Sequence, residues 1–462
     1  MQNIPIEPDA DHRAALGEAT LSFVNQFIDQ RGDAPASSDP VDPGLINELL
    51  AAPGEIGVDL ESLLDKLNRA TDTGFDTASG RFLSYIPSGG LYTAALGSFL
   101  GSALNRYTGG AHASPGAVAI EQSVINWMTS LFGLPNSAGG LLLSGGSLAN
   151  LTAMVAARSQ LGDGFHDGVV YTSEGSHHSI KKAAHIAGIA AKRIRSIPID
   201  ADLRLDPGAL QSAVIADRQD GLRPLMIAAT AGTTDTGAID PLAGCADIAE
   251  SSGAWFHVDA AYGGFFQLTE RGRNSLVGID RADSITVDAH KSLLLPFGIG
   301  GLLVRDPATL VEAHEGHGPY MQDVTKSELP HYLAMGPELS RPNRGLPVWL
   351  ALHVHGIGQF RKTLDRMLDL AALVAGRLDT LPEIELSGRP ELSIVAFRAV
   401  AGDPMTRHVL DVLNDSREVH VSSTTISNRF YVRLAFLSQR TTEAIAMRAI
   451  DLIRDAVTTP LL

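Results

Sequence analysis

The stretch LMIAATAGTTDTGAIDPLAGCADIAESSGAWFHVDAAYGG, residues 225–264, decides the fold that we expect for this chain. It begins with the apolar run LMIAAT and ends with a second one, AWFHVD, followed by small residues. Apolar runs without polar alternation are typical of strands buried on both faces of a parallel sheet. The segment PLAGCADIAESSG between them predicts a short helix that ends near a glycine. The stretch therefore predicts a strand, a helix and a second strand.

The same alternation continues on both sides of this unit, from about residue 139 onward. Further apolar runs are GLLLS, GVVYTS, SITVD and GGLLV. The segment DPGALQSAVIADRQD predicts a helix with Asp206 as its N-cap and Pro207 at its first position. Repetition of strand and helix predicts an α/β fold with a mostly parallel central sheet flanked by helices. Ligands of such sheets gather outside the carboxyl ends of the strands.

The segments on either side of this region have different patterns. Residues 1–75 look helical, with apolar positions three and four apart in LGEATLSFVNQFIDQ and a break rich in Pro, Ser and Asp at 34–43. Near the other end, a long helical pattern starts at LPVWLALHVHG and is followed by the strand-like LSIVAFRAV and NRFYVRLAFL. We therefore predict an N-terminal helical extension (1–75), a large α/β domain (76–346) and a smaller α+β domain (347–462).

Composition excludes several classes of function. The 462 residues carry a formal charge of -16, which argues against a nucleic-acid partner because phosphate backbones need a basic surface. The single cysteine, Cys245, cannot form an internal disulfide, and its apolar helical context predicts a buried small residue. The N-terminus has no signal-peptide pattern, and no stretch has the length of a membrane span. We therefore expect a cytoplasmic protein without a membrane partner.

Polar residues follow the predicted strands, where a ligand would bind. GLLLSGGSLAN passes from a strand through Ser144–Ser147 into a helix, an arrangement suited to a phosphate, although plain helix capping is a common alternative. Ser176, His177 and His178 close the next strand, and Thr233 and Thr234 a further one. A P-loop and a dinucleotide-binding fingerprint are not supported, since their motifs are absent from the sequence.

Two ionisable residues at successive strand ends point to a specific cofactor. Asp259 ends a strongly apolar strand, and a buried carboxylate is costly unless a cation meets it. The cation is either a neighbouring arginine or a pyridinium nitrogen. Lys291 follows the next strand, in SITVDAHKSLLLPFG, and its amine could form an imine with an aldehyde. A phosphate turn, a ring-covering histidine, a ring-nitrogen partner and an imine lysine together predict pyridoxal 5'-phosphate.

These motifs, in this order and spacing, resemble those of the group II pyridoxal-phosphate-dependent amino acid decarboxylases, the family of aromatic amino acid and glutamate decarboxylases. The resemblance rests on LLLSGGSLAN, SEGSHHSIKKA, ATAGTTDTGAID, WFHVDAAYGG and VDAHKSLLLPFG, and it covers most of the chain, including GRFLSYIPSGG and YVRLAFLSQRTTEAI. It implies the fold type I of pyridoxal-phosphate enzymes and a homodimer. The helical N-terminal extension, whose apolar stripe needs a covering surface, also favours a dimer.

The resemblance implies a role for individual residues of this chain. Phosphate would be bound by Gly146, Ser147 and His290, and the imine would form on Lys291. His177 would stack on the ring, with Thr234 at its polar edge, Ala261 beneath it and Asp259 at its nitrogen. Arg433 would approach the substrate carboxylate, and the GRFLSYIPSGG loop would contribute Tyr85 and Pro87 to the substrate pocket. Tyr320 would lie on a mobile catalytic loop.

The expected reaction is decarboxylation of an L-amino acid to an amine and carbon dioxide. Phe82, Tyr85 and Tyr107 near the expected pocket favour an aromatic substrate, with small or acidic amino acids such as aspartate, glutamate and diaminobutyrate as alternatives. An aminotransferase or another lyase on the same scaffold remains open. A binding protein that kept the cofactor site without catalysis is less favoured, because a candidate proton donor, Tyr320, is present. The sequence does not specify which amino acid is used.

Overall fold

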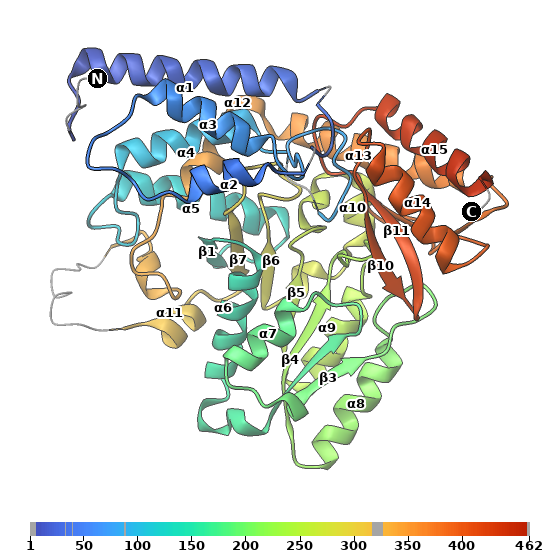
Figure 1. Ribbon diagram of the computed structural model, residues 1–462. Coiled ribbons are helices and arrows are strands. Elements are labelled where there is room, and N and C mark those ends of the chain that lie inside the picture. The colour runs from blue at the N-terminus through green and yellow to red at the C-terminus, as the bar shows by residue number, and fades with distance from the viewer. Residues whose placement is uncertain (1–5, 33, 39, 87–88, 317–326, 460–462) are drawn as a thin grey trace.

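A computed structural model describes residues 6–32, 34–38, 40–86, 89–316 and 327–459. Its described residues contain a seven-stranded sheet and a separate four-stranded sheet (Figure 1). Helices flank the larger sheet, and the smaller sheet belongs to the C-terminal part of the chain. The predicted α/β class with a small α+β C-terminal region is confirmed.

The large sheet has the strand order β1-β7-β6-β5-β4-β2-β3. Strands β3, β2, β4, β5 and β6 run parallel, whereas β7 is antiparallel to both β6 and β1. Because β7 reverses direction, β1 again points the same way as β6, and its carboxyl end lies at the same edge. The strands are β1 (Gly139–Leu143), β2 (Gly168–Ser173), β3 (Ile194–Ile197), β4 (Arg223–Thr230), β5 (Trp255–Asp259), β6 (Ser284–Val287) and β7 (Gly300–Val304).

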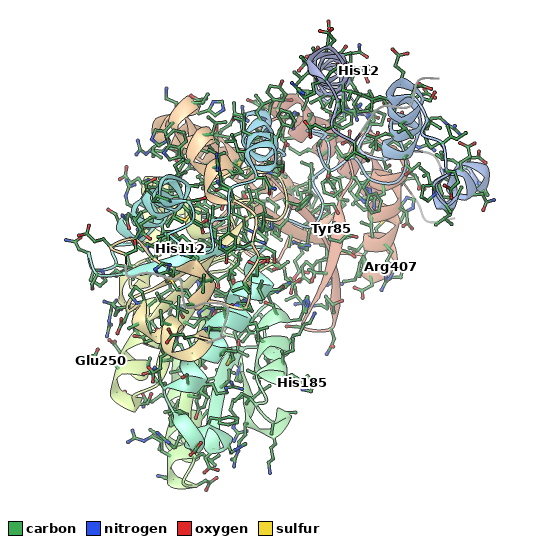
Figure 2. The ribbon with its side chains drawn as sticks, turned by 90° about the vertical axis from the view of Figure 1, so that its left-hand side faces the viewer. His12, Tyr85, His112, His185, Glu250 and Arg407 are labelled. Atoms are coloured by element: carbon green, nitrogen blue, oxygen red, sulfur yellow. The ribbon has the colours of Figure 1, made fainter. Side chains whose placement is uncertain are left out.

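The sheet is buried on both faces, as its uninterrupted apolar runs predict. Successive residues of one strand join different hydrophobic clusters, because side chains alternate across a strand. In β4, Met226 and Ala228 pack into one cluster, whereas Ile227 and Ala229 pack into the other. The first cluster contains residues of α6 (Gly146–Ser159) and α7 (Ser179–Ile186), and the second contains residues of α8 (Pro207–Gln219) and α9 (Leu242–Ser252). Figure 2 shows His185 of α7 and Glu250 of α9 on opposite sides of the molecule.

The helices inside this region begin and end where their signals predict. The Asp206 side chain accepts hydrogen bonds from the backbone N–H groups of Gly208 and Ala209 at the start of α8. Helix α9 ends at Gly253, which has a φ of 71°, a left-handed conformation that glycine adopts without strain. Cys245 of α9 is fully buried, as its context predicts.

The C-terminal part folds around the second sheet, with strand order β10-β11-β9-β8, all antiparallel. Its strands are β8 (Ile384–Leu386), β9 (Ile394–Ala399), β10 (Ser422–Ile426) and β11 (Arg429–Ala435), and its helices are α14 (Asp403–Asp415) and α15 (Glu443–Thr458). The preceding helical pattern is divided into α12 (Gly345–His355) and α13 (Ile357–Leu378) by Gly356, whose φ is 71°. Residues of α13 join both the large-sheet core and the small-sheet core, so the two regions pack tightly. The predicted domain boundaries stay a prediction.

The N-terminal part is helical, and its first helices lie on the outside of the molecule (Figure 1). Within the described residues, neither α1 (Ala10–Gln30) nor α3 (Leu60–Thr71) contains a buried residue. The remaining helices are α2 (Pro43–Leu50), α4 (Tyr92–Leu104), α5 (Pro115–Leu131), α10 (Glu270–Ser275) and α11 (Ala308–His314). No helix in the described parts of the chain has the length and apolarity needed to cross a membrane.

Candidate active site

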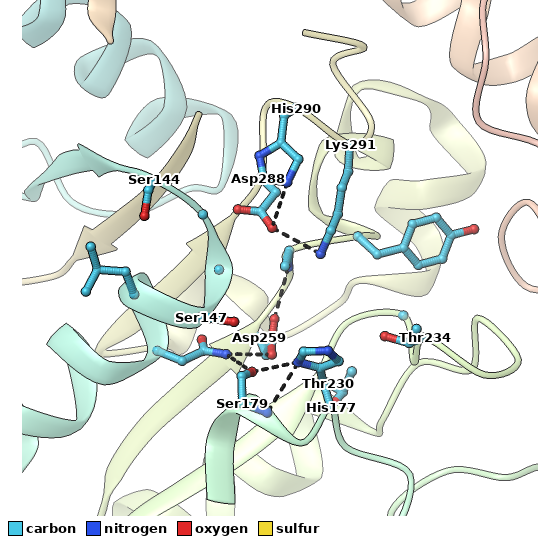
Figure 3. Close-up of a pocket in the computed structure, with 17 residues that line it drawn as sticks. Ser144, Ser147, His177, Ser179, Thr230, Thr234, Asp259, Asp288, His290 and Lys291 are labelled. Carbon is cyan, nitrogen blue, oxygen red and sulfur yellow. Dashed lines mark hydrogen bonds and ion pairs between the residues drawn. The ribbon is translucent and has the colours of Figure 1, made fainter. Parts of the chain in front are cut away.

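A cavity of about 300 Å³ opens at the carboxyl edge of the large sheet (Figure 3). Five strands direct polar residues into it: β1, β2, β4, β5 and β6 each end beside it. Its walls include Gly146, Ser147, His177, Thr234, Asp259, Ala261, His290 and Lys291. The structure therefore brings together all eight residues to which the sequence assigned a contact with the cofactor.

The turn between β1 and α6 provides a backbone cradle. A Cβ atom at Gly146 would lie 3.1 Å from both the Ala261 Cβ and the Asp288 Oδ2, and one at Gly145 would lie 3.2 Å from the His290 ring. Glycine therefore keeps this space open. Among the described residues, no side chain hydrogen-bonds the start of α6. The first N–H groups of a helix have no partner within the helix, so these groups can receive an anion.

The lysine amine is held by a buried carboxylate. Lys291 Nζ lies 3.0 Å from Asp288 Oδ2, and the Asp288 side chain is 2% exposed. His290 Nε2 lies 3.7 Å from the same oxygen, while His290 Nδ1 donates to the Ile299 carbonyl at 2.9 Å. Burial lowers the pKa of His290, and the Asp288 carboxylate opposes this effect. The other oxygen, Asp288 Oδ1, is buried without a hydrogen-bond partner among the described residues.

Asp259 lies on the floor of the cavity with a buried carboxylate, its residue 5% exposed. Its Oδ2 accepts a hydrogen bond from Asn150 Nδ2 at 2.9 Å, and its Oδ1 accepts one from the Ala261 N–H at 3.2 Å. Both donors are neutral, and no lysine or arginine of the described chain forms an ion pair with this carboxylate. The alternative that an arginine neutralises Asp259 is therefore not realised there, and the carboxylate is available to a cationic group bound in the cavity.

His177, rather than His178, faces the cavity. Its Nδ1 is 2.8 Å from the Ser179 Oγ, and the Ser179 backbone N–H donates to the same nitrogen at 3.3 Å. Burial lowers the pKa of His177, whereas the nearby Asp259 carboxylate acts in the opposite direction. The ring is therefore oriented by Ser179 at one nitrogen and leaves the other, Nε2, for a ligand.

Two of the predicted substrate-binding residues, Tyr85 and Arg433, do not line this cavity. Arg433 in β11 is buried, and its guanidinium donates to the carbonyls of Thr234, Asp235 and Tyr85 and to the Ser422 Oγ. Protein oxygens thus occupy much of its donor capacity, and its contact with a substrate carboxylate stays a prediction. The Tyr85 side chain is 57% exposed. Pro87 and Tyr320 lie outside the described residues.

Sequence reasoning did not assign Asn150, Ser179, His257 or Asp288 to the site. Spacing could have indicated two of them. Asn150 follows Gly146 by four residues on α6, which places it one turn further along the same face. His257 precedes Asp259 by two residues in β5, so both side chains lie on the same face of the sheet. Asp288 directly follows β6 and lies close in sequence to His290 and Lys291. Its contact with Lys291, however, depends on the conformation of the turn between them.

These residues fit pyridoxal phosphate. The buried carboxylate of Asp259 suits a protonated ring nitrogen, the glycine turn leaves room for a phosphate at the start of α6, and Lys291 offers a primary amine within the same cavity. The small side chain of Ala261 leaves space for a flat ring above Asp259. The fit thus covers both ends of the cofactor.

Comparison with known proteins agrees with this geometry. The family model described as the pyridoxal-dependent decarboxylase conserved domain matches residues 43–400. The chain belongs to the pyridoxal-dependent decarboxylase family. It is 32% identical to an aromatic-L-amino-acid decarboxylase of Bacillus atrophaeus, over 95% of this chain and 94% of that protein. It is also 31% identical to an L-2,4-diaminobutyrate decarboxylase of Rhizobium meliloti (strain 1021), over 96% and 92% of the two chains.

Solved structures lead to the same family. The crystal structure of Oryza sativa TDC with PLP and tryptamine superposes with a TM-score of 0.93 at 27% identity, covering 98% of this chain and 99% of that chain. This decarboxylase therefore shares the fold of a pyridoxal-phosphate enzyme along its length. The predictions of an amino acid decarboxylase and of pyridoxal phosphate as its cofactor are confirmed. The two alternative functions left open by the sequence, an aminotransferase and a non-catalytic binding protein, are therefore rejected.

Proposed function

We propose that this decarboxylase converts an aromatic L-amino acid into the corresponding amine and carbon dioxide. The observation that carries the proposal is the set of contacts around Tyr85. Its backbone carbonyl and that of Thr234, a residue of the cavity wall, bind the same nitrogen of Arg433. This shared partner ties the Tyr85 backbone to Thr234, and we propose that the Tyr85 ring contacts the side chain of the substrate.

A cluster of rings adjoins this tyrosine. The Phe82 ring lies 6.5 Å from that of Tyr85 and 5.7 Å from that of His420, and the Phe75 ring lies 4.1 Å from His420 and 6.3 Å from Phe82. Aromatic pairs prefer such offset and tilted arrangements. The similarity to an aromatic-L-amino-acid decarboxylase gives the proposal independent support. The similarity to a diaminobutyrate decarboxylase keeps a basic substrate as the competing outcome.

The roles of the site residues follow from their chemistry. When bound, pyridoxal phosphate supplies a conjugated cationic ring that accepts the electron pair left by the departing carboxylate. Lys291 binds the cofactor through its amine, and Gly146, Ser147 and His290 bind its phosphate. Asp259 keeps a proton on the ring nitrogen by offering a buried negative charge. His177 covers the ring and donates a hydrogen bond to the substrate.

The substrate test is carbon dioxide release across a panel of amino acids. With the holoenzyme, kcat/KM for at least one of tryptophan, tyrosine and phenylalanine is expected to exceed that for aspartate, glutamate and 2,4-diaminobutyrate by about tenfold or more, because a misfitting side chain costs ~1–3 kcal/mol. Equimolar amine measured in the same samples establishes decarboxylation, and the Lys291→Ala variant provides the blank. A preference for 2,4-diaminobutyrate would overturn the aromatic proposal while leaving the family intact.

We also propose that Tyr320 returns the proton to the α-carbon after carbon dioxide leaves. Tyr320→Phe keeps the ring but removes the phenol, so the expected product shifts from amine toward aldehyde, ammonia and peroxide formed with oxygen. Side reactions of this kind are suppressed when a loop excludes solvent and delivers the proton. Amine, aldehyde and peroxide are quantified side by side in air. An unchanged amine fraction and rate in the variant, or predominant aldehyde from the native enzyme, would contradict this role.

We propose a homodimer as the working unit, with the N-terminal helices covered by a second copy. Apolar side chains on and beside α1, α2 and α3 are exposed, namely Leu21, Ile46, Leu49, Leu50, Leu63 and Leu67. Exposed apolar surface of this kind usually marks an interface. Light scattering of the active enzyme is expected to give twice the mass of the 48.8 kDa chain. A fully active monomer at assay concentration would contradict the proposal. The cytoplasmic location remains a prediction from the sequence.

A further inference from the structure

A buried chain of hydrogen bonds leads from the amino ends of β5 and β6 into the active site. Trp255 Nε1 donates to Ser284 Oγ at 2.7 Å, and Ser284 Oγ lies 2.8 Å from His257 Nδ1. His257 Nε2 lies 3.0 Å from Asn150 Oδ1. The residues Ser284 and His257 are fully buried and Asn150 is 2% exposed. Water therefore has little access to this chain.

At Asn150 the chain divides toward the two groups that face the cofactor ring. Asn150 Nδ2 lies 2.9 Å from Asp259 Oδ2 and 2.9 Å from Ser179 Oγ (Figure 3). The Ser179 Oγ is in turn 2.8 Å from His177 Nδ1. Asn150 is therefore the junction between the carboxylate of Asp259 and the imidazole of His177.

The carboxylate of Asp259 determines which atoms donate in the bonds that join it to Asn150, His257 and Ser284. An ionised Asp259 can only accept, so the amide atom of Asn150 that faces it is the NH2 group, and the carbonyl oxygen of Asn150 faces His257. His257 must then donate from Nε2. Burial lowers the pKa of His257 to about 4, which keeps the ring neutral, and its Nδ1 accepts from the Ser284 hydroxyl.

The same logic fixes the proton on His177. The second N–H of Asn150 donates to Ser179 Oγ, and the Ser179 hydroxyl hydrogen is thereby directed to His177 Nδ1. The backbone N–H of Ser179 also donates to His177 Nδ1, in agreement with an unprotonated nitrogen. A neutral imidazole that accepts at Nδ1 carries its proton at Nε2.

We propose that Asn150 and Ser179 are positioning residues that set the tautomer of His177, so that its Nε2–H points into the cavity as a hydrogen-bond donor. This inference rests on the proposed roles of Asp259 and His177. The inference adds that Asp259 and His177 are linked through Asn150 and Ser179. Because Asp259 accepts a hydrogen bond from Asn150, His177 carries its proton on Nε2 and donates from that atom. His177 therefore acts as a donor to the substrate carboxylate and not as a base.

The test observes the imidazole protons directly. In histidine-labelled holoenzyme, 15N NMR is expected to show His177 as a single neutral tautomer with the proton on Nε2, its signals assigned by their loss in His177→Gln. Ser179→Ala removes the hydroxyl and leaves only the longer backbone N–H contact at 3.3 Å, so a measurable fraction of the tautomer with its proton on Nδ1 is expected. Ser179→Thr keeps the hydroxyl and should restore the single tautomer. A native proton on Nδ1, or an unchanged tautomer in Ser179→Ala, would overturn the proposal.

Asn150→Asp provides an independent variant of nearly the same size. A carboxylate there has no donor for Ser179, and if it takes up a proton it will share that proton with Asp259. In either state the Ser179 hydroxyl turns toward residue 150, and the His177 proton is expected to move to Nδ1. Retention of the proton on Nε2 in a folded, cofactor-loaded variant would refute the role of Asn150. Since no substrate is present, the result is separate from the choice of amino acid.

Discussion

Lys291→Ala is expected to yield a protein that no longer holds pyridoxal phosphate covalently. The Lys291 amine is the primary amine of the described cavity wall, held by Asp288 at 3.0 Å. Native protein should show visible absorbance that is lost on treatment with borohydride, because the imine is reduced to a stable adduct. The peptide that contains Lys291 should carry this adduct. Turnover is expected to fall by about three orders of magnitude or more, at ~1.36 kcal/mol for each factor of ten.

A matched control separates this effect from the loss of any positive charge. Lys182 lies on α7 and is exposed, so Lys182→Ala should keep the reducible absorbance and near-native turnover. Circular dichroism checks that both variants are folded. The assignment of Lys291 is wrong if Lys291→Ala keeps the same borohydride-sensitive chromophore.

Asp259→Asn is expected to leave the fold intact and to remove most of the catalytic power. Asparagine preserves the size of the side chain but not its charge, and the described neighbours of Asp259 donate to it only through neutral N–H groups. The protonated state of the ring nitrogen would lose its buried counter-charge. Turnover should fall by two or more orders of magnitude, about 3 kcal/mol of barrier. Steady-state rates are normalised to bound cofactor.

The control for this variant is Asp220→Asn, which removes an exposed carboxylate at the end of α8. It should retain native turnover. The visible spectrum adds a second measurement, because the absorbance of the bound cofactor depends on the charge of its ring nitrogen. Near-native decarboxylation by a folded, fully loaded Asp259→Asn would exclude Asp259 as the ring-nitrogen partner.

Much of the fold could be predicted because burial on both sides leaves a plain signature in the sequence. The apolar runs at β1, β2, β4, β5, β6 and β7 are all strands in the structure. The missing strand, β3, has the sequence IRSI and lies at an edge of the sheet with only one of its four residues buried. Such a strand carries little apolar signal. The break at Gly356 was also missed, since a glycine inside a helical pattern does not by itself end a helix.

Site residues could be predicted from the sequence where they end a strand of the sheet or follow one closely. Lys291, Asp259 and His177 are of this kind. Asn150 and Asp288 act through contacts across elements, which the local sequence does not encode. Arg433 illustrates the same limit, because its carbonyl partners come from the loop after β4 and from the segment around Tyr85. Only the packed molecule brings these segments together.

The reversed strand β7 has a consequence for the order in which the protein is made. It pairs with β1 in the register Gly139–Val304, and a Cβ at Gly300 would lie 2.6 Å from the Gly145 Cα. The glycine turn before α6 is thus packed against a strand that the ribosome synthesises much later. Closing so long a loop carries an entropic cost that local contacts do not offset early in folding. The nascent chain therefore completes its cofactor cradle only after β7 has emerged, even though the glycine turn itself emerges early.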